Sequence, residues 1–355
     1  MKNILVIEPF YQGSHKYWLD KLTSLSQHNI KAVKKKGVWW KWRVQQSGFE
    51  YRLPKVHNFD IIVTTNMVNL ATWAGMNRKN IGKAKLVHYF HENQLNYPGQ
   101  TKEDIMVFGL IDVLSSFCAD MIVFNSHYHR ELFLKTIQST SRKLREKLPE
   151  QDIKQLRGKA HVLPIGIEIN KFLKHKFETV NKTPLLLWNH RWEKDKKPTL
   201  FLKTLMRLSR EGYDFKLCML GKAPREPLPI FAQAKKELKN HIVQWGAVSG
   251  FEDYARWLWK ADLLPVTSDH DFFGISVLEA AVCNTSLLLP HKNAYPEHFD
   301  SQKLSHIYFH SDDEFYTKLK KWLESRADHT IPSVELEKYQ WENIIAQYDE
   351  FFNQL

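Results

Sequence analysis

The segment His270-Asp-Phe-Phe-Gly-Ile-Ser-Val-Leu-Glu-Ala280 decides the fold of this chain and gives its first candidate site. The apolar run 263–267 before it predicts a buried strand, and Val277–Val282 predicts a helix after it. The turn between them lies at the carboxyl end of a strand, where open α/β sheets bind ligands. Gly274 lets backbone approach a ligand closely, and the N–H groups at the start of the next helix can hold a phosphate or sugar oxygen.

A structural alternative explains the same segment. Ser276 is followed three residues later by Glu279, which is the spacing of a capping box that does no more than start a helix. The segment alone leaves both interpretations open, and the rest of the chain favours the ligand site.

Strand-sized apolar runs alternate with helical patterns along the chain, which predicts an α/β protein with parallel sheets covered by helices. In the first half we expect strands at 3–8, 31–33, 60–65, 85–90, 120–124 and 161–163. In the second half we expect them at 185–190, 215–220, 242–245, 262–266, 286–289 and 307–309. Because the two halves repeat the same rhythm, we predict two Rossmann-like domains.

Domain boundaries follow from composition and periodicity. The polar, lysine-rich stretch 173–183 predicts the join, with an N-terminal domain at 1–175 and a C-terminal domain at 176–332. The spacing of large apolar residues from Trp341 to Phe352 predicts a helix within 333–355 that crosses back over the domains. The basic stretch 136–159 predicts an exposed helical excursion.

Composition limits the classes of protein and partner. The chain has 355 residues, 43% hydrophobic and 25% charged, which suffices for two domains with separate cores. The net charge of +12 favours an anionic partner, namely nucleic acid, a membrane surface or a phosphorylated substrate, over an unassigned basic surface. No apolar run reaches membrane-spanning length, and the start predicts a strand instead of a signal peptide. Cys118, Cys218 and Cys283 lie far apart in apolar contexts, which predicts reduced thiols in a cytoplasmic protein.

The second half opens with a buried strand that runs into two cations. Arg191 directly follows it, Lys196 comes five residues later, and Pro198 lies in the first turn of the next expected helix. A planar guanidinium and a compact ammonium suit a diphosphate, so we favour phosphate binding over a charged helix start without a ligand.

Polar loops also follow strands of the first half. Glu8–Lys16 has one glycine at position 13, which is no dinucleotide fingerprint but can present backbone N–H groups at a helix start. His91 follows the fourth strand and is a candidate polar contact for a substrate. His88 and His91 would point to opposite faces of an extended chain, so we do not expect them to share a metal ion.

The stretch Lys34–Arg43 interleaves cations with three tryptophans. Exposed Trp and Arg side chains stack on unpaired bases while Lys holds phosphates, so we predict a loop that forms a functional surface. Tryptophans that are simply packed remain the alternative.

Taken together these residues resemble retaining glycosyltransferases of family 4, which have the GT-B fold, and within them the tRNA-queuosine mannosyltransferase branch. The landmarks are 8–16, 89–95, 123–126, 190–196 and 272–280, in that order, together with the aromatic-basic stretch 35–43. The resemblance covers nearly the whole chain and implies two Rossmann-like domains that face each other across a cleft, the second binding the donor and the first the acceptor.

The resemblance also implies roles for residues. Catalysis would depend on His91, Arg191, Lys196 and Asp271, of which the two cations stabilise the leaving diphosphate. Donor binding would use Gly13, Arg191, Lys196, Phe273, Gly274, Ile275 and Glu279, with Glu279 on the ribose hydroxyls. The acceptor tRNA would be bound by Lys35, Trp39, Trp40, Lys41, Trp42, Arg43 and Asn93.

The activity that the resemblance implies is transfer of mannose from GDP-mannose to queuosine in a tRNA anticodon loop, with retention and with neither metal nor cofactor. The family's first acid is usually glutamate and here is Asp271, which leaves galactose or another nucleotide open as donor. Two alternatives remain: a glycosyltransferase for a lipid or small-molecule acceptor at a membrane surface, and an RNA-binding protein with a relict nucleotide cleft.

Overall fold

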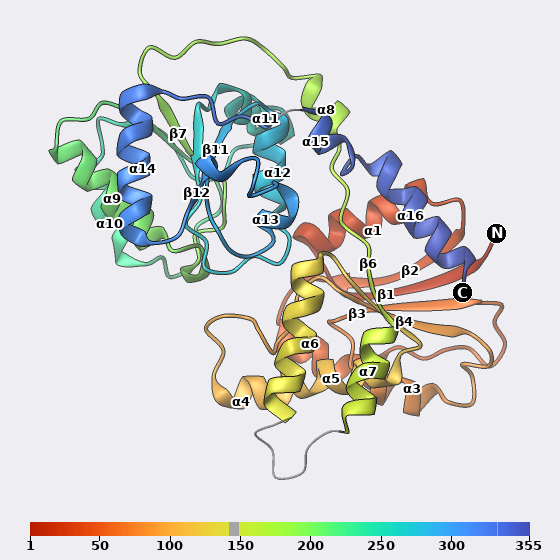
Figure 1. Ribbon diagram of the computed structural model, residues 1–355. Coiled ribbons are helices and arrows are strands. Elements are labelled where there is room, and N and C mark those ends of the chain that lie inside the picture. The colour runs from red at the N-terminus through yellow and green to blue at the C-terminus, as the bar shows by residue number, and fades with distance from the viewer. Residues whose placement is uncertain (142–148, 332) are drawn as a thin grey trace. The chain divides into compact units, whose positions relative to one another are not determined.

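The computed structural model describes residues 1–141, 149–331 and 333–355, which form two compact units (Figure 1). Unit 1 comprises Met1–Gly166 and Trp341–Leu355, and unit 2 comprises Ile167–Gln340. Each unit holds one six-stranded sheet whose paired strands are all parallel. The prediction of two Rossmann-like α/β domains is therefore confirmed.

The strands of unit 1 are β1 Asn3–Tyr11, β2 Asn29–Lys36, β3 Ile61–Thr65, β4 Lys85–Phe90, β5 Met121–Phe124 and β6 Ala160–Val162. Its helices are α1 Gly13–Leu25, α2 Trp40–Glu50, α3 Leu70–Asn77, α4 Lys102–Asp104, the π-helix η1 Ile105–Gly109, α5 Leu110–Cys118, α6 His127–Ser141, α7 Glu150–Gly158 and α16 Trp341–Asn353. The strands lie in the order β2-β1-β3-β4-β5-β6. The direction of winding reverses between β1 and β3, so this is the switch point where such sheets bind ligands.

The strands of unit 2 are β7 Leu185–Trp188, β8 Lys216–Met219, β9 Ile242–Trp245, β10 Leu263–Pro265, β11 Ser286–Pro290 and β12 Tyr308–Phe309. Its helices are α8 Ile169–Leu173, η2 Lys194–Lys196, α9 Pro198–Arg210, α10 Pro229–Glu237, α11 Phe251–Lys260, α12 Ile275–Val282, α13 Tyr295–His298, η3 Ser305–Ile307, α14 Asp312–Ser325 and α15 Ser333–Glu337. The strand order β12-β11-β10-β7-β8-β9 places the switch point between β7 and β10.

Burial explains why apolar runs in the sequence predicted the strands. β3, β7 and β11 are buried along their whole length, as expected for parallel strands covered on both faces. All twelve expected strands are present, with ends that differ by a few residues because polar edge residues carry no apolar signal. β1, for example, continues past Glu8 to Tyr11.

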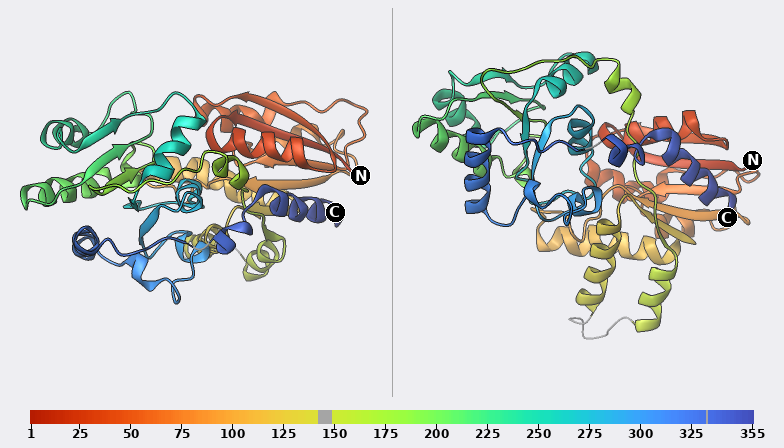
Figure 2. Two further views of the ribbon diagram at one scale, coloured as in Figure 1. Left: turned by 90° about the horizontal axis from the view of Figure 1, so that it is seen from above. Right: turned by 45° about the horizontal axis from the view of Figure 1, so that its top comes forward.

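The boundaries of the two units differ from those of the expected domains. Residues 167–175 belong to unit 2, where the carbonyl of Phe172 accepts a hydrogen bond of 2.9 Å from the indole of Trp259. The expected helix at 333–355 is two helices, α15 and α16, with a break at 338–340 where Gln340 bridges to Ile167. Only α16 lies in unit 1, and both chain ends are in that unit (Figures 1 and 2).

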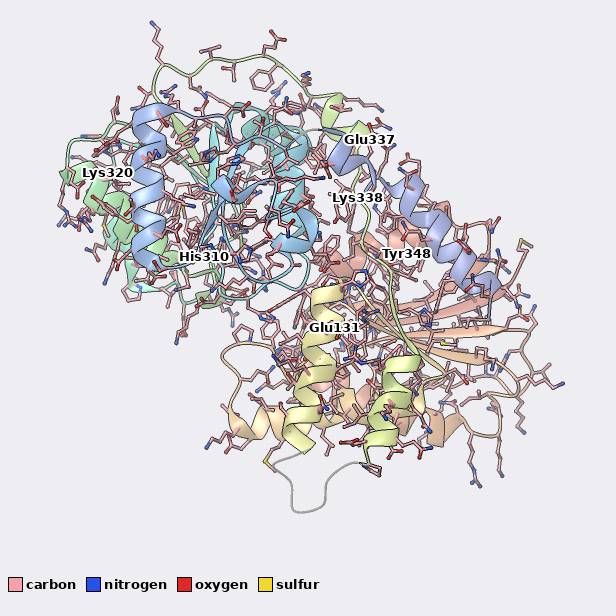
Figure 3. All side chains as sticks on the ribbon, viewed as in Figure 1. Glu131, His310, Lys320, Glu337, Lys338 and Tyr348 are labelled. Atoms are coloured by element: carbon pink, nitrogen blue, oxygen red, sulfur yellow. The ribbon has the colours of Figure 1, made fainter. Side chains whose placement is uncertain are left out.

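Tyr348 anchors α16 within unit 1. The side chain is labelled in Figure 3. Its hydroxyl accepts from the Trp18 indole at 2.9 Å and donates to the carbonyl of Leu163 at 3.1 Å. Of the basic stretch 136–159, the described parts are the end of α6 and α7, whereas residues 142–148 lie outside the described residues. Among the described residues no helix is long and apolar enough to cross a bilayer.

Candidate active-site residues at two sheet edges

The candidate donor site of unit 2 lies where β7 and β10 end, on the two sides of the switch point. Asn189, just after β7, donates from Nδ2 to the carbonyl of Ser276 at 2.7 Å. The Ser276 hydroxyl lies 3.0 Å from Nδ1 of His190. The helix starts at Ile275 with Gly274 as N-cap, so the capping-box alternative is wrong: Ser276 links the two loops instead.

Lys196 is the central cation of this edge. Its ammonium donates to the carbonyl of His270 at 2.9 Å and lies 3.3 Å from Oδ2 of Asp271 and 3.2 Å from Oδ2 of Asp195. The residue is only 8% exposed, and Thr267 holds its backbone through a hydrogen bond of 2.8 Å to its carbonyl. The structure thus brings the predicted Lys196 and Asp271 together, although they are far apart in the sequence.

Asp271 is held as a carboxylate. Burial raises the pKa of this group, but the positive charge of Lys196, with His190 and hydrogen bonds, lowers it further, so the net pKa lies below the usual value. Its Oδ2 also accepts from the hydroxyl of Tyr295 at 3.2 Å. The acid is therefore ionised and fixed before any ligand arrives.

Arg191 differs from Lys196 in exposure. Its side chain is 57% exposed, and its guanidinium lies 2.9 Å from Oε2 of Glu193 and 4.0 Å from Oδ2 of Asp195. An exposed ion pair is weak and easily exchanged, so the guanidinium can turn to an arriving anion.

Gly274 is required by the geometry of the turn. Its φ of +81° is unfavourable for other residues, and a Cβ atom there would lie 2.8 Å from the Tyr295 ring. The carbonyl of the preceding Phe273 contacts Nε2 of His298. Residues 273–275 are therefore locked in one conformation at the start of α12.

Glu279 lies one turn further along α12. Its carboxylate accepts a hydrogen bond of 2.6 Å from Tyr254 on α11. Burial raises the pKa of Glu279 to about 7, against the lowering effects of Tyr254 and Lys171. The group therefore titrates near neutrality, where a new hydrogen-bond donor would favour its ionised form.

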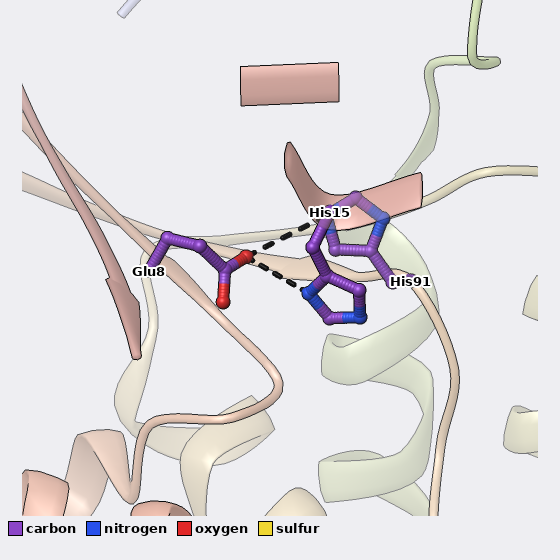
Figure 4. Close-up of side chains that lie close together, drawn as sticks. All are labelled: Glu8, His15 and His91. Atoms are coloured by element: carbon purple, nitrogen blue, oxygen red, sulfur yellow. Dashed lines mark hydrogen bonds and ion pairs between the residues drawn. The ribbon is translucent and has the colours of Figure 1, made fainter. Parts of the chain in front are cut away.

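The candidate acceptor edge of unit 1 contains a cluster of three buried side chains (Figure 4). Nδ1 of His15 lies 2.9 Å from Oε2 of Glu8, and Nε2 of His91 lies 3.9 Å from the same oxygen. The two imidazole rings are 4.0 Å apart between centroids. His91 was predicted, whereas Glu8 and His15 had been quoted only as part of the loop that contains Gly13, which opens α1 with φ of +53°.

Buried polar atoms without hydrogen-bond partners gather at this edge. They belong to residues that follow or end β3 and β4: Thr65 Oγ1, Asn66 Nδ2, His91 Nδ1, His91 Nε2 and Asn93 Nδ2. Such atoms are uncommon in folded proteins because each loses its hydration without replacement. Their concentration favours a ligand rich in hydrogen-bonding groups. Asn93 also has a structural role, since its Oδ1 accepts from the backbone of Asn96 at 3.0 Å.

The aromatic-basic stretch was expected to be a loop, but only residues 37–39 connect two elements; the rest is the end of β2 and the start of α2. Trp39 is 77% exposed and Trp42 is 61% exposed, whereas Trp40 packs on Phe108 with ring centroids 4.9 Å apart. The other predicted residues here are bound or half-covered: Lys35 pairs with Glu50, Lys41 with Asp104 at 2.6 Å, and Arg43 is half-buried. The sequence missed the exposed apolar residues of η1 and α5 nearby in this unit, which are Met106, Val107, Leu110 and Leu114.

Two family models match the chain. One described as "tRNA-queuosine alpha-mannosyltransferase N-terminal" matches residues 3–167, and one described as "Glycosyl transferases group 1" matches residues 170–339. A tRNA-queuosine alpha-mannosyltransferase of Drosophila melanogaster is 29% identical over 369 residues, which cover 99% of this chain and 96% of the relative. A probable sucrose-phosphate synthase of Thermosipho melanesiensis is 21% identical over 205 residues, covering 55% of this chain and 47% of the relative.

Solved structures share the fold. HepE of Anabaena, solved with UDP and glucose, has a TM-score of 0.71 at 12% identity and covers 100% of both chains. Sucrose-phosphate synthase of Thermosynechococcus elongatus has a TM-score of 0.69 at 13% identity, covering 100% of this chain and 99% of its own. At such identities the likeness establishes the two-domain GT-B architecture alone.

Proposed function

Because this chain belongs to the tRNA-queuosine alpha-mannosyltransferase family of group 1 glycosyltransferases, we propose that it transfers mannose from GDP-mannose to queuosine in the anticodon loop of a tRNA. The observation that carries the proposal is the meeting of Lys196 and Asp271 at the switch point of unit 2, in a chain whose other half matches the queuosine-specific model.

The donor side of the reaction is assigned to unit 2. Lys196, ordered by two carboxylates and a carbonyl, and the exposed Arg191 neutralise the charge that grows on the departing diphosphate. Asp271 and the locked turn Phe273–Ile275 position the sugar, and Glu279 accepts hydrogen bonds from the ribose hydroxyls. Since two protein cations supply the positive charge, we propose that departure of the diphosphate needs no metal.

The acceptor side is assigned to unit 1. The partnerless polar atoms around His91 suit the hydroxyl groups of a modified nucleoside. Trp39 and Trp42 offer exposed indole faces for unpaired bases of the anticodon loop, and the excess of 51 Lys and Arg over 39 Asp and Glu residues suits the phosphate backbone.

Mass spectrometry of nucleosides tests both substrates at once. Queuosine-containing tRNA is incubated with GDP-mannose, GDP-glucose, UDP-glucose or UDP-galactose in separate reactions, and the same tRNA with guanosine in place of queuosine is the matched control. A gain of one hexose on queuosine, with GDP-mannose alone and not in the control tRNA, is the expected result. Transfer from UDP-galactose would reassign the donor, and transfer to the control tRNA would reassign the acceptor.

A lipid acceptor is the second candidate, because Trp42, Met106 and Leu110 expose large apolar side chains on unit 1. Such residues also anchor proteins in a membrane interface. Sedimentation with anionic liposomes, without affinity for tRNA, would favour this candidate over the first.

A further inference from the structure

We propose that Glu8 and His15 form a proton-accepting dyad, in which Nε2 of His15 takes the proton of the acceptor hydroxyl and Glu8 positions the imidazole. The inference rests on the proposed transfer to a nucleoside hydroxyl and adds two residues to that reaction. Neither was assigned a role by its sequence pattern.

The carboxylate of Glu8 is fixed from both sides. The residue is fully buried near the end of β1, and its Oε1 accepts from the backbone N–H of Phe10 at 2.8 Å. Its Oε2 lies 2.9 Å from Nδ1 of His15. A carboxylate can only accept hydrogen bonds, so Nδ1 carries a hydrogen and, in the neutral ring, the lone pair is on Nε2.

The other ring nitrogen of His15 is the one available for chemistry. Nε2 has no hydrogen-bond partner among the described residues, and neither ring nitrogen of the neighbouring His91 has one. The two rings lie beside each other at the sheet edge, with centroids 4.0 Å apart. An imidazole whose Nδ1–H is held by a buried carboxylate is the arrangement that enzymes use for general bases.

The surrounding charges set the basicity of His15. Burial lowers its pKa, but attraction and hydrogen bonding by Glu8, with a contribution from Glu92, raise the net pKa above 6.5. Lys16 follows it on α1 and pairs with Asp20, while His91 has a pKa well below its usual value, chiefly because it is buried, and is neutral. A base whose pKa is raised binds the proton of the acceptor more strongly.

A metal ion is the competing occupant, since the three donor atoms lie within 4.8 Å of one another. Zinc analysis of the wild type and of Glu8→Gln separates this occupant from the dyad.

The step balances without a further reactant. The O–H bond of the acceptor breaks and its proton goes to Nε2 of His15. The oxygen forms its bond to the anomeric carbon on the face from which the phosphate departs, so that the configuration is retained, and the electron pair of the broken bond leaves with the nucleoside diphosphate. The imidazolium then releases its proton to water.

Single-turnover rates of mannose transfer to queuosine-containing tRNA, measured from pH 5.5 to about 9, test the dyad. In His15→Asn the amide replaces the Nδ1 donor to Glu8 but offers no base, so we expect the rate to fall about 10²-fold or more while the Kd for GDP-mannose stays within about twofold. In the wild type the rate rises with pH, with a midpoint above 6.5. Glu8→Gln should lower both the rate and that midpoint.

His28→Asn is the matched control, because His28 is also a buried imidazole beside a carboxylate of unit 1, with Nε2 3.9 Å from Oδ1 of Asp349. We expect its rate and midpoint to match the wild type. Wild-type rates in His15→Asn, an unchanged midpoint in Glu8→Gln, or weakened GDP-mannose binding with an unchanged rate would overturn the dyad. The dyad would also be overturned if the wild type bound one equivalent of zinc and Glu8→Gln bound none. If the wild-type protein itself transfers no mannose, the proposed function fails together with the dyad.

Discussion

The two sheet edges differ in the charged side chains that they bury. At the edge of unit 2, Lys196 already has Asp195, Asp271 and a carbonyl as partners. At the edge of unit 1, the buried carboxylate of Glu8 has His15 as its partner. Among the described residues both edges also keep buried polar atoms without a hydrogen-bond partner, such as those of His91 in unit 1 and of His190 in unit 2. A buried charge without a partner costs much more free energy than a buried neutral donor or acceptor without one. The difference is therefore a preordered cation, Lys196, at the edge of unit 2, where the proposed function places a charged ligand.

The largest effect is expected when a cation of unit 2 is removed. We expect Arg191→Ala to lower kcat by about 10²- to 10³-fold while tRNA affinity hardly changes, because the guanidinium stabilises charge that develops only as the diphosphate leaves. Steady-state kinetics with GDP-mannose and filter binding of tRNA measure the two effects. Arg210→Ala is the matched control: Arg210 is an exposed arginine at the end of α9 that pairs with Glu237, and its removal should leave both quantities unchanged.

The exposed tryptophans of unit 1 give the next largest effect. Trp39→Ala and Trp42→Ala should each weaken tRNA binding by about tenfold through lost stacking, without lowering the melting temperature. Trp40→Ala should instead lower the melting temperature, since Trp40 packs on Phe108. Unchanged tRNA affinity in the Trp39→Ala, Trp42→Ala double variant would contradict the assignment of this surface.

Glu279 should make the affinity of unit 2 for the donor depend on pH. Its pKa of about 7 results mainly from burial, so it is largely protonated at pH 6 and largely ionised at pH 8. If the carboxylate binds the ribose, calorimetry should show an affinity for GDP-mannose that rises about tenfold over this range, and Glu279→Gln should abolish the rise.

The same residue has the opposite effect on the ligand-free protein. Because the folded-state pKa is raised from 4.5, the stability that protonated Glu279 contributes is present at low pH and declines as pH rises toward and through 7. Glu279→Gln should therefore flatten this decline in denaturant titrations. A decline of the same size in the variant would contradict the assigned titration.

The smallest expected effect is on stability, when alanine replaces a glycine whose Cβ would be crowded or a glycine with an unfavourable φ alone. Gly274→Ala combines an unfavourable φ of +81° with a Cβ contact of 2.8 Å to Tyr295, whereas Gly212→Ala has a similar φ of +86° and no atom within 4 Å. We expect Gly212→Ala to be destabilised by about 1 kcal/mol and Gly274→Ala by more, with loss of donor affinity only in the latter. Equal losses of stability would show that the turn can relax away from Tyr295.

Amino-acid patterns alone predicted the strands, their grouping into two Rossmann-like domains and most of the charged residues after β7 and β10. These features follow from local apolar runs and from the polar residues that end them, which any segment reveals without its neighbours. The same local signals predicted His91 but gave Glu8 and His15 no role.

Which of these residues lie together depends on how the chain folds in three dimensions. The switch point brings Lys196 to Asp271 and the end of β1 to His91, because parallel strands distant in sequence end at one edge. It also decided that Ser276 bonds His190 instead of capping its helix, and that the C-terminal segment breaks at 338–340. Partners, burial and the resulting pKa values depend on groups from several elements at once, so no single stretch of sequence contains them.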